Sequence, residues 1–145
     1  VTHVSVDSAE DLSLLESGLR LATRQRNVAA TPGRAQVAHA LWQGCVQGGA
    51  QASGRRVGAW AAGLAVGQPA DFVVLDASHR ALSGLEPASM LAAHVFASDR
   101  TRAIDGVWSA GRAVVQQGRH ALRGAAPAGF VAARRQLLRQ GWTRP

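Results

Sequence analysis

The stretch Gly63–Asp76, which reads GLAVGQPADFVVLD, constrains the fold more tightly than any other part of the sequence. Three turn formers, Gly63, Gly67 and Pro69, lead into the apolar run Phe72–Leu75. A run of apolar, mostly β-favouring residues between turn signals predicts a short strand that is buried on both faces. Such a strand needs a neighbour on each edge, and the sequence offers few other strand-like runs. We therefore expect its partners to be missing from this chain or to come from another one.

Hydrophobic periodicity predicts two helices before this strand. The first covers 8–26 and begins with a capping-box arrangement of Ser8 and Asp11. The second begins at Thr31-Pro32, with Thr as the N-cap and Pro at the first helical position, and Gly48-Gly49 and Gly54 weaken and end it. One face of the first helix carries leucines at helical spacing, namely Leu12, Leu15 and Leu19.

After the strand, the sequence predicts a short helix over 87–94 that begins at Pro87. The runs Ile104–Ser109 and Arg112–Gln116 flank a two-residue turn that contains glycine, which is a β-hairpin signal. We expect the hairpin to end at Gly118 and a final helix to start at Pro127. The predicted fold class is therefore α/β, and the length of 145 residues favours one domain.

Composition excludes several classes of function. The net charge is +7 and every basic residue is Arg, but the arginines are scattered and few aromatic residues accompany them. We therefore expect a solvated basic surface and no nucleic-acid partner. No apolar run approaches the length of a membrane span and no signal peptide is visible, so we expect no membrane partner and a cytoplasmic location. Cys45 is the only cysteine and is expected in the core.

The residues alone do not define a catalytic site. A metal site needs three or four donors brought together. The histidines form no HxH, HExxH or CxxC-type spacing, and no glycine-rich phosphate loop precedes a helix. These histidines are His3, His39, His79, His94 and His120.

Three stretches resemble one enzyme superfamily. GLAVGQPADFVVLD resembles the segment that closes amidohydrolase-superfamily enzymes, and VWSAGRAVVQQGRH resembles their terminal hairpin. THVSVDSAEDLSLLESGLRLATRQRN resembles the stretch after the last barrel strand of formimidoylglutamate deiminases. The matching positions are His3, Val4, Ser5, Val6, Glu16, Gly18, Arg20 and Leu21 near the N-terminus, and Gly111, Val114, Val115, Gly118 and Arg119 in the hairpin.

The resemblance covers almost the whole chain but only the C-terminal third or so of such an enzyme. It implies a metal-dependent (β/α)8 barrel beside a small β-sandwich that is built from both chain ends. Residues 1–60 would be the last barrel loop and the C-terminal barrel helices, with helix 8–26 as the last of them. Residues 61–125 would hold the C-terminal sandwich strands and a short helix, and 126–145 a C-terminal helix.

The implied activity is hydrolysis of N-formimidoyl-L-glutamate to N-formyl-L-glutamate and ammonia, in histidine degradation. In that family a zinc-bound water attacks the formimidoyl carbon. The resemblance implies a small-molecule substrate and a homodimer for the full-length enzyme. Its histidine ligands come from strands that precede the matched region.

The metal-binding Asp of the family is missing at the matching position. Aligning His3 with the family's His places Val1 where the family has its Asp ligand, and Val can neither bind zinc nor accept a proton. Either the Asp has been lost, or Val1 reflects the point at which this sequence begins. We therefore expect this chain alone to bind no zinc and to be inactive. His3 either lines the mouth of the active site or has no role. No substrate-binding residue is identified.

Two other interpretations remain open. The chain could derive from another amidohydrolase-superfamily deaminase, such as a guanine or S-adenosylhomocysteine type, although residues 3–6 favour the formimidoylglutamate enzymes. It could instead be a non-catalytic remnant or interaction module whose exposed strand edge pairs with a partner. In either case, uncovered apolar faces predict association or poor solubility.

Overall fold

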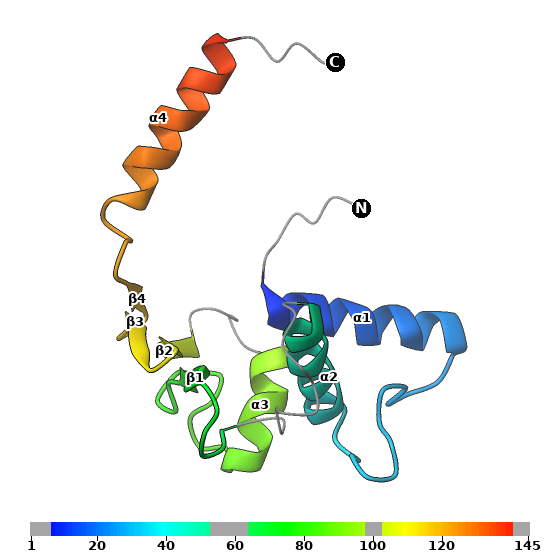
Figure 1. Ribbon diagram of the computed structural model, residues 1–145. Helices are drawn as coiled ribbons and strands as arrows, with labels where there is room; N and C mark the ends of the chain where they lie inside the picture. Colours follow the sequence, from blue (N-terminus) through cyan, green and yellow to red (C-terminus); the bar gives the residue numbers. More distant parts are fainter. Residues whose placement is uncertain (1–6, 53–63, 98–102, 141–145) are drawn as a thin grey trace.

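The computed structural model describes residues 7–52, 64–97 and 103–140. Three helices, α1, α2 and α3, lie together, the sheet lies beside α3, and α4 stands apart from them (Figure 1). The elements in chain order are α1 (Ser8–Thr23), α2 (Val37–Ala52), β1 (Phe72–Leu75), α3 (Pro87–Phe96), β2 (Ile104–Ser109), β3 (Arg112–Gln116), β4 (Arg119–His120) and α4 (Ala126–Arg139). The predicted mixture of helices and strands is confirmed.

Helix α1 begins at a side-chain cap and ends at a residue in the left-handed conformation. The Asp7 carboxylate accepts hydrogen bonds from the N–H groups of Ala9 and Glu10, at 3.0 and 3.3 Å. The N-cap is therefore Asp7, and the predicted capping box of Ser8 and Asp11 is wrong. The helix stops at Thr23, before the predicted end, because Arg24 adopts the left-handed conformation that terminates helices.

Helix α2 differs from its prediction at its start. Thr31 and Arg34 exchange two backbone hydrogen bonds, at 2.8 and 3.0 Å, around Pro32-Gly33. Pro followed by Gly suits a tight turn, so this segment is a turn and not the start of a helix. The helix begins at Val37 and runs through Gly48 and Gly49 to Ala52. Ala50, which follows the two glycines, is buried.

The core of the helical part is small and is made of aliphatic side chains from α1, α2 and α3. It consists of Leu12, Val37, Ala38, Leu41 and Val95, with Ala29, Ala30, Trp42, Leu91 and Ala92 packed against it. Cys45 is exposed, so its predicted core position is wrong. The physical reason is that α2 packs through the face of Ala38 and Leu41, whereas Cys45 lines a groove toward the sheet.

The sheet is antiparallel, with its strands in the order β1-β2-β3-β4. Strand β1 pairs with β2, with Phe72 opposite Trp108. The expectation that the partners of β1 lie outside the chain is therefore wrong for one edge, while within the described residues its other edge has no strand beside it. Burial on both faces is also not observed, because Val73 is 42% and Val74 is 38% exposed.

The β2–β3 hairpin occupies its predicted residues. Its turn residues Ala110 and Gly111 both have positive φ, at 48° and 76°, as a two-residue hairpin turn requires. The prediction that strand pairing ends at Gly118 is wrong. Instead, Gln117 and Gly118 repeat the turn geometry and lead into β4.

The final helix, α4, includes the predicted proline in its first turn. None of its residues is buried, and Phe130, Leu137 and Leu138 are all more than half exposed. The guanidinium of Arg134 lies over the Phe130 ring, 5.5 Å from its centroid. Among the helices that the structure describes, none is long and apolar enough to cross a membrane.

Gly106 packs closely against the Trp108 ring, and a substitution there tests this packing in the sheet. A Cβ added at Gly106 would lie 2.3 Å from Cζ3 of Trp108, whose ring stacks on Phe72 at a centroid distance of 4.8 Å. Gly106→Ala should therefore lower the free energy of unfolding by about 1–3 kcal/mol, measured by urea titration. Gly44→Ala, in the exposed middle of α2 with open space around it, should instead stabilise by about 0.5–1 kcal/mol. Equal effects of the two substitutions would contradict this packing.

Candidate functional site

Glu16 is the most unusual ionisable side chain in the described part of the molecule, because its exposure is only 1%. It lies on the inner face of α1, one turn after Leu12. A buried carboxylate is costly unless it is paired and hydrogen-bonded, so its partners decide what it does.

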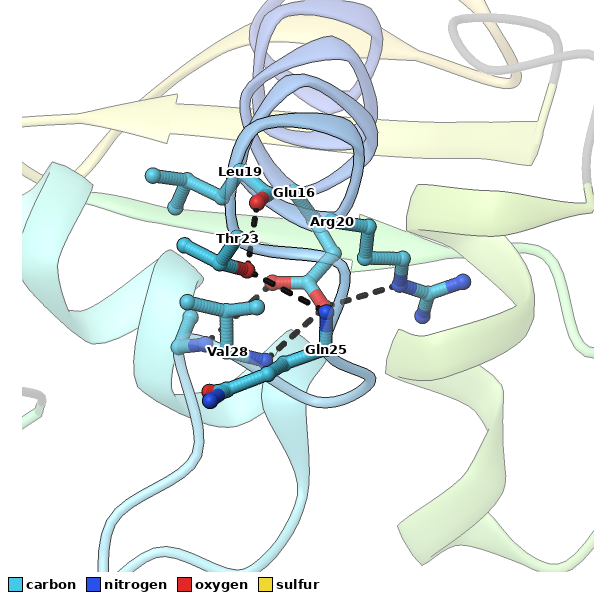
Figure 2. Close-up of polar contacts among 7 residues, drawn as sticks. Glu16, Leu19, Arg20, Thr23, Gln25 and Val28 are labelled. Carbon is cyan, nitrogen blue, oxygen red and sulfur yellow. Dashed lines mark hydrogen bonds and ion pairs between the residues drawn. The ribbon is translucent and has the colours of Figure 1, made fainter.

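The Glu16 carboxylate joins α1 to the loop that follows it. Oε1 accepts hydrogen bonds from Nε of Arg20, at 2.9 Å, and from the N–H of Val28, at 3.2 Å. Oε2 accepts from the N–H of Ala29, at 3.3 Å. Figure 2 shows the carboxylate between the Arg20 side chain and this loop. We call these residues the Glu16 clamp, and its contacts are those of a structural anchor.

The start of the same loop is fixed by Thr23. Its hydroxyl donates to the Leu19 carbonyl, at 2.7 Å, and accepts from the N–H of Gln25, at 3.3 Å (Figure 2). The loop then delivers Ala29 and Ala30 to the core. The positions Glu16 and Arg20, which carry the deiminase resemblance, therefore hold the backbone between α1 and α2 in place.

An apolar groove of about 610 Å³ lies between the sheet and helices α2 and α3. Its walls include Trp42, Leu91, Phe72 and Val107. Asp71 also lines it, but its Oδ1 accepts a hydrogen bond of 2.6 Å from the N–H of Ala110. This groove therefore has the character of a packing surface and presents no ordered set of catalytic groups.

His94 is the buried histidine of the groove, with an exposure of 3%. Its ring lies edge-on to Trp42, with a centroid distance of 5.9 Å. Burial lowers the pKa of His94 from its ordinary value because it disfavours the imidazolium, and the negative charge of Asp7 opposes this in part. The neutral form is therefore the one that the fold favours.

The other predicted site residues are not brought together. Val1 and His3 lie outside the described residues. His79 and His120 each accept a local backbone N–H through Nδ1, and His39 is exposed on α2. Within ranges 7–52, 64–97 and 103–140, no group of three or more His, Cys, Asp or Glu side chains could hold a metal ion. Those residues therefore do not fit a zinc centre.

Sequence reasoning missed the burial of Glu16 and of His94. For Glu16 a signal was present, because positions 12, 16 and 19 share the helical spacing of the apolar face and Arg20 follows one turn later. An acid inside an apolar stripe, with a base at i+4, indicates a buried and paired carboxylate. For His94 the sequence shows only a lone histidine in an apolar helix.

Comparison with known proteins defines the class of this chain. A crystal structure of an amidohydrolase from Brucella melitensis matches with a TM-score of 0.72 and 34% sequence identity, over 90% of this chain and 27% of that chain. No family model matches the sequence. The chain is thus similar, over most of its length, to part of an amidohydrolase.

Within this class, the sequence matches one curated enzyme. It is 36% identical over 137 residues to formimidoylglutamate deiminase from Pseudomonas aeruginosa. The match covers 94% of this chain and 29% of the relative. The resemblance to an amidohydrolase, and specifically to formimidoylglutamate deiminase, is therefore confirmed, and a C-terminal position in such an enzyme is consistent with it.

The Glu16 clamp generates a stability prediction. Glu16→Gln removes the charge that Arg20 pairs with and one of the acceptors for the loop N–H groups. We expect a loss of about 1–3 kcal/mol in the free energy of unfolding, measured by urea titration. Glu86→Gln is the matched control, because Glu86 is exposed and makes no side-chain cap bond. A control that costs as much as Glu16→Gln would contradict the clamp.

His94 generates a prediction about pH. Its pKa in the folded state lies below the ordinary value of 6.5, so the unfolded state binds more protons as the pH falls. The contribution of His94 to stability should be complete above about pH 6.5 and should be lost progressively below it. Urea titrations at pH 7.5 and 5.5 would measure the difference. His94→Gln should shrink the difference, whereas His39→Gln, on the exposed side of α2, should leave it unchanged.

Proposed function

We propose that this chain is the C-terminal portion of an amidohydrolase-type deiminase that hydrolyses N-formimidoyl-L-glutamate to N-formyl-L-glutamate and ammonia. The observation that carries the proposal is the 36% identity to formimidoylglutamate deiminase over 94% of the chain. The match to a solved amidohydrolase structure at 34% identity supports the amidohydrolase part of the proposal. Because the chain spans only 29% of the curated relative, the activity belongs to the longer enzyme.

The described residues support a scaffolding role within such an enzyme. Glu16 accepts from the N–H of Val28 in the loop after α1, and Asp71 accepts from the N–H of Ala110 in the hairpin turn. Asp76 accepts from the N–H of Ser78 in the turn that follows β1. The hydroxyl and the N–H of Ser78 both donate to the Asp76 carboxylate and hold its pKa below the ordinary value. We assign no step of the reaction to a described residue. The zinc of the family would be held by the remainder of the enzyme.

The finer parts of the proposal follow the resemblance. In the full-length enzyme, residues 1–60 would close a (β/α)8 barrel, and the sheet within 61–125 would be one part of a β-sandwich. Residues 126–145 would form the C-terminal helix. We further propose a homodimer that works in histidine degradation in the cytoplasm. The chain alone would be inactive.

A hybrid protein tests this function. This chain would replace the matching segment of the Pseudomonas aeruginosa deiminase. If position 1 must be an Asp for activity, the hybrid with Val1→Asp should release ammonia from N-formimidoyl-L-glutamate, and the hybrid with Val1 should release much less. The isolated chain should release none.

The same assay includes the rival substrates. Guanine and S-adenosylhomocysteine would be offered to the hybrid alongside N-formimidoyl-L-glutamate. If the hybrid prefers guanine or S-adenosylhomocysteine, the proposed substrate is wrong. Turnover by the isolated chain would overturn the claim that the activity needs the longer enzyme.

A further inference from the structure

Helix α1 carries apolar residues on two opposite faces. Its inner face, with Ala9 and Leu12, is buried against the core. Leu14 and Leu21 lie two turns apart on the other side and are 63% and 83% exposed. A helix that is apolar on both sides is typical of a position between two layers of structure.

Small residues complete this second face. Gly18 falls between Leu14 and Leu21 at the i, i+4, i+7 spacing of a helical stripe. A Cβ at Gly18 would meet no atom within 4 Å, so another element could approach the backbone closely there. We call this surface the outer face of α1, and its residues are Leu14, Leu15, Gly18, Leu21 and Ala22.

Singly exposed leucines are normal on protein surfaces, but a continuous apolar stripe is not. The five named residues of the outer face carry no charge, and the charged residue that shares this side of the helix, Asp11, three and four positions before Leu14 and Leu15, is acidic, which disfavours an anionic partner such as nucleic acid. The exposed apolar residues of α4 differ in this respect, because Arg134, Arg135 and Arg139 lie among them. The outer face of α1 therefore resembles half of a packed interior.

We propose that the outer face of α1 packs against the larger part of an amidohydrolase-type deiminase that this chain does not span. The share of each relative that this chain leaves unmatched points to this occupant. The chain matches its relatives over 94% and 90% of its own residues but spans only 29% and 27% of theirs. The bulk of each relative must therefore contact some surface of the matched segment. The inference rests on the proposed function and names the surface through which this segment joins the enzyme.

The hybrid protein tests the surface directly. Leu14→Gln with Leu21→Gln makes the outer face polar while keeping a good helix former at both positions. Leu137→Gln with Leu138→Gln is the matched control, since these α4 leucines are 66% and 74% exposed. In the isolated chain, both pairs should leave the urea midpoint unchanged. In the hybrid, only the α1 pair should lower the Tm, by ~5 °C or more.

A second measurement does not depend on the hybrid being stable. The tagged chain would be co-expressed with the Pseudomonas aeruginosa deiminase lacking its matching segment. We expect the chain to capture that piece, the α1 pair to reduce capture at least tenfold and the α4 pair to leave it unchanged. Equal behaviour of the two pairs, or no capture combined with an insoluble hybrid, would overturn the proposal.

Light scattering of the isolated chain tests whether a second copy of the chain occupies the outer face instead. A dimer that the α1 pair dissociates, together with a hybrid that tolerates the α1 pair, would assign the face to a second copy and overturn the proposal. These readouts are independent of substrate. A stable hybrid that is sensitive to the α1 pair but inactive on N-formimidoyl-L-glutamate would refute the proposed function alone.

Discussion

The packing of the helical part depends on one buried carboxylate. Burying a charge is unfavourable, and the cost is offset here because Glu16 accepts three hydrogen bonds. Two of them come from the loop after α1, so the carboxylate fixes the path by which Ala29 reaches the core. Without that anchor, the loop N–H groups would be left without a partner beside an apolar interior. The clamp thus couples helix, loop and core.

Hydrogen bonds also join the two C-terminal motifs, the stretch that ends at Asp76 and the β2–β3 hairpin, into one structural unit. Asp71 accepts from the N–H of Ala110 in the hairpin turn, and the N–H of Asp76 donates to the Ala103 carbonyl. Between these two links, Phe72 stacks on Trp108. Residues far apart in the sequence therefore fix both ends of the β1–β2 pair. This explains why an amidohydrolase-like segment carries both motifs although neither contributes to a metal site in the described residues.

Local signals predicted the elements whose geometry is set by neighbouring residues. The hairpin was predicted to the residue because Gly111 suits a turn with positive φ, and α3 begins at Pro87 as expected. The prediction for the start of α2 was wrong because one local signal outweighed another. The Thr31-Pro32 signal favours a helix start, but Gly33 allows Thr31 and Arg34 to close a turn.

The candidate site was less predictable than the fold, for a physical reason. Whether an ionisable residue is buried depends on which helix faces meet, and periodicity does not determine this when a helix is apolar on two sides. In α1 the leucines at 12 and 14 are equivalent in hydrophobicity, yet one is 7% and the other 63% exposed. The acid at position 16 became buried because α2 and α3 cover its side of the helix.

Few large apolar side chains are buried in the described residues, and many are exposed. Leu82 is the only large apolar side chain with less than 2% exposure in the described residues, whereas leucines on α1 and α4 are more than half exposed. Hydrophobic burial is the dominant favourable term in folding, so a fold with this distribution obtains limited stability from its own core. The polar groups of the Glu16 clamp and the Asp71 carboxylate are hydrogen-bonded, and these bonds set local geometry. The outer face of α1 is the exposed apolar surface that we propose further structure covers, and the segment would then gain stability from contact with the rest of the longer enzyme.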